Sequence, residues 1–110
     1  MNRFILAATL AALSIGFTAQ AHAGDLETME LATHLGSVLA SEEACGLAYD
    51  QAAIAAFIEE KVPADDLGFP SMLSTMTSGA QYELQGMSAS QKTAHCAQIK
   101  RIAKSYGFTH

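Results

Sequence analysis

The residues best suited to chemistry are the two cysteines, Cys45 and Cys96, with His95 directly before the second of them. A thiol and an imidazole could form a nucleophile–base pair, or could join His34 in binding zinc. Adjacent residues on a helix point about 100° apart, so His95 and Cys96 do not face one another. Structural zinc sites draw on closely spaced ligand pairs, which neither cysteine has. The spacing therefore predicts neither a catalytic residue nor a metal ligand here.

A disulfide is the better interpretation of the two cysteines. An even number of cysteines in an exported chain is typical of disulfide pairing. We expect Cys45 and Cys96 to be joined, and the bond would close a loop of roughly fifty residues. In the chain-entropy model this is worth about 4 kcal/mol, a large share of the stability of a small domain. A redox-active thiol is not expected, because the chain has no Cys-x-x-Cys motif.

The first 23 residues, MNRFILAATLAALSIGFTAQAHA, indicate export. Arg3 supplies the positive start, an apolar run follows, and Ala21-His22-Ala23 fits the cleavage rule of signal peptidase. We therefore expect residues 1–23 to be a signal peptide and residues 24–110 to be the mature helical domain, periplasmic or secreted. The apolar run is shorter than the roughly 20 residues of a membrane span, so no stable membrane insertion is expected after cleavage.

The charge of the mature part argues against one class of partner. Beyond Ala23 the chain has eleven acidic and five basic side chains, a net charge of −6. An acidic surface repels phosphate, so nucleic acid is not expected to bind. The charge is uneven, because residues 92–104 hold four bases and no acid. These bases could complement the end of a helix dipole or form a basic patch.

Apolar spacing and capping residues predict an all-α fold, a small bundle of three or four short helices tied by one disulfide. The expected helices cover residues 26–40, the segment between Asp50 and Pro63, a segment from between Asp66 and Pro70 to about Gly86, and the segment from Ser88 to Gly107. Asp25 and Asp50 are predicted N-caps, and Ser88 with Gln91 forms a capping box. Gly36 weakens the first helix. No strand pattern is present.

One apolar stripe on the third expected helix has two interpretations. Phe69, Leu73 and Met76 follow helical spacing, with Met72 and Met87 nearby. Such a stripe usually packs into the core. Its methionines could also line an adaptable groove for apolar ligands or peptides, so these three residues are a candidate binding face.

The remaining polar residues do not form a recognisable active site. The carboxylate pairs Glu42-Glu43, Glu59-Glu60 and Asp65-Asp66 are adjacent in sequence and do not converge. Hydrolase, zinc-protease, phosphate-loop and dinucleotide motifs are absent, so no cofactor is predicted. A small secreted enzyme or toxin remains an alternative, because absent motifs do not exclude an unfamiliar site.

In plan the chain resembles the HdeA and HdeB acid-stress chaperones of the bacterial periplasm, which are also small, exported, helical and tied by one disulfide. The resemblance is carried by the signal peptide and by two widely spaced cysteines, Cys45 and Cys96. It implies an acid-triggered chaperone. The residues themselves favour a non-enzymatic exported protein that binds another protein or a small apolar ligand. Both hypotheses are kept.

Overall fold

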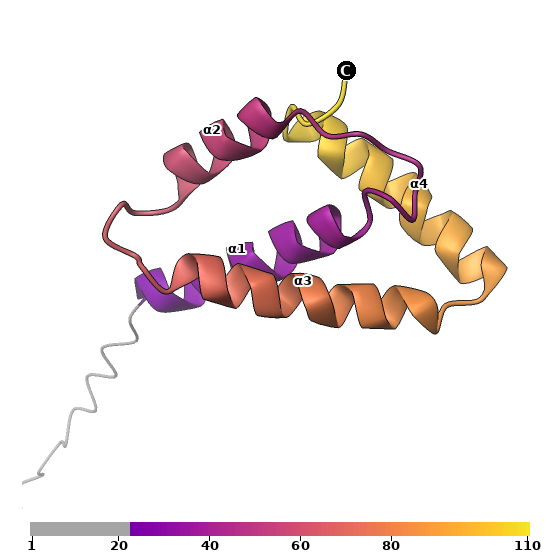
Figure 1. Cartoon of the computed structure of the whole chain (residues 1–110), viewed down its shortest axis with the longest axis horizontal. Helices are drawn as coiled ribbons and strands as arrows, with labels where there is room; N and C mark the ends of the chain where they lie inside the picture. Colours follow the sequence, from indigo (N-terminus) through magenta and orange to yellow (C-terminus); the bar gives the residue numbers. More distant parts are fainter. Residues whose placement is uncertain (1–22) are drawn as a thin grey trace, which may run out of the picture.

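The structure, a computed structural model, describes residues 23–110, and its regular elements in that range are all helices. The elements are α1 (Ala23–Ala40), α2 (Gln51–Lys61), α3 (Phe69–Gln85) and α4 (Ala89–Ser105) (Figure 1). The predicted all-α bundle with one disulfide is confirmed. The predicted signal peptide lies outside the described residues except for Ala23, and it stays a prediction. No helix of this described range is long and apolar enough to cross a membrane.

Side-chain caps determine where two helices begin. The Asp50 carboxylate accepts hydrogen bonds from the backbone N–H groups of Ala52 and Ala53, at 2.9 and 3.3 Å, at the start of α2. At the start of α4 the Ser88 hydroxyl accepts from the Gln91 N–H, and the Gln91 side chain accepts from the Ser88 N–H. These contacts satisfy backbone donors that the first turn of a helix leaves free. Both predicted caps are confirmed.

Proline and glycine explain the other boundaries. Pro63 follows the end of α2, and Pro70 lies in the first turn of α3, where a missing N–H costs least. Gly107 follows α4 with a φ of +79°, a left-handed conformation that glycine adopts without strain. The prediction that Asp25 caps α1 is wrong, because the helical backbone extends back to Ala23.

The first helix lies at the centre of the molecule. Figure 1 shows α3 along one side, α2 and α4 meeting on the opposite side, and α1 between them. The residues Ala32, Leu35 and Val38 of α1 are at most 1% exposed. Gly36 lets α1 and α3 approach closely, because a Cβ atom built there would lie 2.9 Å from the Met76 Cβ and 3.0 Å from the α3 backbone. The residue that weakens the helix pattern in the sequence is therefore required by the packing.

The core joins α1 to side chains from α3, from α4 and from the C-terminal segment. Phe69 from α3, Ile99 and Ala103 from α4, and Phe108 beyond α4 pack against it, and each is at most 3% exposed. Phe108 turns back into the core directly after Gly107, where its N–H donates to the Ala103 carbonyl at 2.9 Å. Burial of large apolar side chains is the main favourable contribution to folding, roughly 1.5–3 kcal/mol for each.

The second helix is attached at the edge of the bundle. None of its residues is buried. The Phe57 ring packs on Tyr106 and Phe108, with ring centroids 4.5 and 5.6 Å apart. The backbone N–H of Asp50 donates to the Phe108 carbonyl at 2.9 Å. The half-buried Ile54 and Ile58 also pack against the core, so α2 is held by partly exposed apolar contacts and one backbone hydrogen bond to the chain terminus.

Candidate functional site

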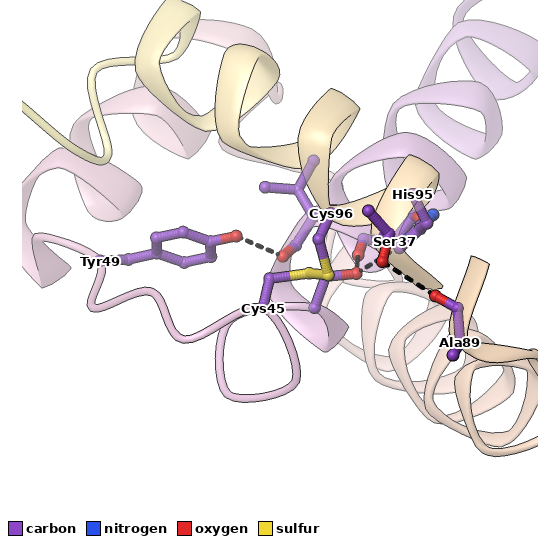
Figure 2. The surroundings of a disulfide bond; sticks show 9 residues. Ser37, Cys45, Tyr49, Ala89, His95 and Cys96 are labelled. Atoms are coloured by element: carbon purple, nitrogen blue, oxygen red, sulfur yellow. Dashed lines mark hydrogen bonds between the residues drawn. A yellow bond between two sulfur atoms is a disulfide. The ribbon is translucent and has the colours of Figure 1, made fainter. Parts of the chain in front are cut away.

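The structure joins Cys45 to Cys96, as predicted (Figure 2). Their Cα atoms lie 5.3 Å apart, within the usual range for a disulfide. The bond ties the turn after α1 to the middle of α4 and leaves no free thiol in the described chain. The disulfide therefore holds the turn after α1 against α4.

The predicted apolar face of α3 lies against the core. Phe69 is 2% exposed and belongs to the buried cluster, while Leu73 and Met76 are half-buried and pack against that cluster. In this folded state the three residues therefore serve as packing residues. Their role in ligand binding stays a prediction. In the folded state they do not form an apolar surface that is open to solvent.

A serine–histidine contact joins α4 to the end of α1. Ser41 Oγ lies 2.8 Å from His95 Nε2, and it donates a hydrogen bond to the Ser37 carbonyl at 2.7 Å. Because its proton is used in that bond, Ser41 accepts from the imidazole N–H. Ser41 is also fully buried. The pair is therefore arranged to link two helices, and it does not present an activated nucleophile to solvent. The sequence did not reveal it, since the partners are 54 residues apart.

Tyr49 joins α1 to residues 41–50, which we call the connector before α2. The Tyr49 hydroxyl donates to the Val38 carbonyl at 2.8 Å, and the Tyr49 backbone N–H donates to a carboxylate oxygen of Glu42 at 3.0 Å. Burial, together with the nearby Glu42 charge, raises the pKa of Tyr49 to about 12. A phenol that must stay neutral to donate this bond is a structural group rather than a general base at neutral pH.

The best candidate site is a groove between α1 and α4, with a volume of about 490 Å³. It exists because α1 packs mainly on α3 and touches α4 over a much shorter stretch. Val38 and Ile99 lie deepest, and the half-buried Ile102 and Tyr106 extend the apolar wall towards solvent. We call this hollow the α1–α4 groove. Its volume is within the range of about 300–1,000 Å³ that small-ligand sites occupy.

Polar groups line the rim of the α1–α4 groove. They are His34 and Ser37 from α1, and Gln98, Arg101 and Ser105 from α4. No carboxylate is among the residues that line it. Arg101 is exposed and has no acidic side chain within ion-pair distance in the described range. The groove thus offers apolar contact below and hydrogen-bond donors above, which is the combination found in small-ligand sites.

A hollow beside α2, of about 370 Å³, is also largely apolar, but it is smaller and has two carboxylates, Glu59 and Asp66, in its lining. Two further hollows have a different chemistry. One of about 580 Å³ is lined by Glu42, Glu43 and Lys92, among other residues, and is dominated by polar groups. Another lies over the disulfide, between Lys92 and Lys100, and its floor has only alanines and the two cysteines for apolar contact. The described residues hold no group of three or more side chains suited to a metal ion. The α1–α4 groove is therefore the site with the strongest case for an apolar ligand.

Comparison with known proteins finds no matching family model, no matching curated protein and no matching solved structure. The likeness to HdeA and HdeB consequently remains one of general plan, namely a small helical domain with one disulfide between Cys45 and Cys96. Function has to be argued from the geometry of the groove, because a shared plan does not determine what a site binds.

Proposed function

We propose that this chain is an exported, non-enzymatic binding protein whose α1–α4 groove receives the apolar part of a small ligand. The observation that carries the proposal is the apolar wall formed by Ile102 and Tyr106 above the buried Val38 and Ile99. Small-ligand sites combine such a wall with a few polar groups that orient the ligand. The rim of the groove supplies those polar groups.

Two features support export. The disulfide between Cys45 and Cys96 fits a periplasmic or extracellular compartment, where such bonds persist. The first 23 residues have the order of a signal peptide. A disulfide-linked domain with a preformed groove is suited to bind a ligand outside the cytoplasm, because the disulfide persists there.

The proposal is tested with the mature, oxidised protein and N-phenylnaphthylamine, a neutral dye that fluoresces in apolar surroundings. Ser105→Trp should block the mouth of the groove and abolish dye binding. Ser90→Trp is the matched control, because Ser90 is an exposed α4 residue outside the groove. Equal dye binding by both variants would reject the groove as the site.

A second candidate function, an acid-triggered chaperone, is favoured by the carboxylates that hold the connector before α2. Asp50 caps α2, and Glu42 binds the backbone of Tyr49. Neutral carboxyl groups accept hydrogen bonds less strongly than carboxylates do, and in acid the net charge of the mature part swings from −6 towards about +9. Because α2 has no buried residue, it should separate from the bundle first and uncover the Phe57–Phe108 contact.

The chaperone hypothesis predicts suppression of client aggregation at pH 2–3 and none at pH 7. The Asp50→Asn variant retains a cap that cannot ionise, so suppression of client aggregation should begin at a lower pH than in the wild type. A protein that stays folded and inert towards clients at pH 2 would contradict this second function. It would leave the binding-protein proposal unaffected.

A further inference from the structure

The charges around the α1–α4 groove differ from those of the chain as a whole, and the apolar wall of the groove distinguishes it from the hollow between Lys92 and Lys100. Beyond Ala23 the chain has more than twice as many acids as bases, yet the groove is lined by Arg101 and His34 and by no acid. The helix α4, which supplies most of the groove, contains three lysines and one arginine and no acidic residue. A locally positive site on an acidic protein selects for an anionic ligand.

Resting on the binding function proposed above, we propose that the ligand is a single-chain amphiphile with a carboxylate head, of the fatty-acid type. Its apolar chain lies along Ile102 and Tyr106, over Val38 and Ile99, and its carboxylate pairs with the Arg101 guanidinium. The proposal accounts for both halves of the site. An apolar wall without the arginine would serve any oily molecule, and a cation without the wall would serve any anion.

Arg101 is suited to this role by its geometry and by its lack of a partner. A guanidinium presents parallel N–H donors that match the two oxygens of a carboxylate. Among the described residues, the ion pair is formed by Lys61 and Glu60 on α2, away from the groove, and Arg101 takes no part in it. The guanidinium of Arg101 is therefore available to a ligand without breaking an internal contact. Ser37 and Ser105 add hydroxyl donors on either side of the groove.

The experiment compares decanoate with decanol, which have the same chain length and differ in the head group. Each is titrated against the dye complex of the mature, oxidised protein at pH 7.5 and low salt. We expect decanoate to displace the dye at about three- to tenfold lower concentration than decanol, the range given by a partly exposed charged hydrogen bond. Raising the salt concentration should reduce this preference.

The variant Arg101→Gln should remove the preference for decanoate over decanol. Lys104→Gln is the matched control, because it removes one positive charge from the same helix at a residue that does not line the groove. Equal affinity for decanoate and decanol in the wild type, or an unchanged preference in Arg101→Gln, would overturn the carboxylate proposal while leaving the groove as a site for neutral ligands. If neither ligand nor the dye binds, both proposals are rejected.

Discussion

The helices α1 and α2 differ in how deeply their side chains are buried. α1 is central, with Leu35 fully buried and Gly36 pressed against the α3 backbone. α2 lies at the edge, has no fully buried residue, and is held by half-buried side chains such as Ile58 and Phe57 and by the hydrogen bonds of Asp50. Full burial of apolar side chains is costly to undo, whereas contacts between partly exposed side chains open more easily. The α1–α3–α4 core should therefore behave as a rigid frame that contains the α1–α4 groove, and α2 as its most easily opened part.

The largest expected effect comes from breaking the link between the two sides of that frame. Cys45→Ala and Cys96→Ala should each lower the free energy of unfolding by about 2–5 kcal/mol, because the unfolded chain regains the entropy of a long loop. Urea unfolding at neutral pH measures the change. An equal loss after reduction of the wild-type protein is the control. A wild-type protein with two titratable thiols would contradict the disulfide.

Tyr49 links the connector before α2 to α1, and its titration reports on that link. The unfolded chain loses the phenol proton near pH 10, while the folded chain keeps it until its raised pKa of about 12. Stability contributed by the neutral phenol is therefore complete below pH 10 and declines between pH 10 and 12, by on the order of 2 kcal/mol. In Tyr49→Phe the free energy of unfolding should change less between pH 10 and 12 than in the wild type. Tyr82→Phe, at a residue 78% exposed, should not.

The close packing of α1 on α3 is tested by two glycines. Gly36→Ala should destabilise the protein by about 1–2 kcal/mol, because overpacking outweighs the gain in helix propensity. Gly79→Ala should instead stabilise it by about 0.5–1 kcal/mol, since a Cβ at that position meets no atom within 4 Å. Replacing glycine by alanine should therefore lower the free energy of unfolding at one position and raise it at the other. If both variants were stabilised, the α1–α3 approach would be looser than described.

The smallest expected effect concerns the cap of α2. Asp50→Ala should cost about 1 kcal/mol by removing two hydrogen bonds at the helix start. Amide hydrogen exchange should increase within α2 and remain slow in α1. Ser88→Ala, which removes the cap of α4, is the comparison. Faster exchange throughout the bundle in Asp50→Ala would show that α2 is not a separately opening part.

The sequence predicted the elements well where a single residue decides a boundary. Asp50, Ser88 and Gly107 act through contacts within one turn, so their effect is readable without the fold. For α3 the sequence limits the start only to the segment between Asp66 and Pro70, because the aspartates, Gly68 and Pro70 are all compatible with a helix start. In the sequence Gly36 indicates only a weaker helix, because the contact that requires glycine, with Met76, lies across the α1–α3 interface.

The candidate site could not be predicted in the same way. The α1–α4 groove depends on how far α1 diverges from α4, and its rim joins His34 to Arg101 from distant parts of the chain. The stripe of Phe69 and Met76 was visible in the sequence, but apolar spacing alone does not distinguish core packing from an open surface. The missing information was the relative orientation of helices, which tertiary packing decides.

The most direct test of the central claim is a backbone amide NMR titration of the mature, oxidised protein with the neutral dye. We predict that the largest shift changes occur at Ser37 and Val38 on α1 and at Ile99 and Ile102 on α4, with α3 little affected. Changes centred on residues 69–76 of α3, or no saturable change, would contradict the α1–α4 groove as the binding site.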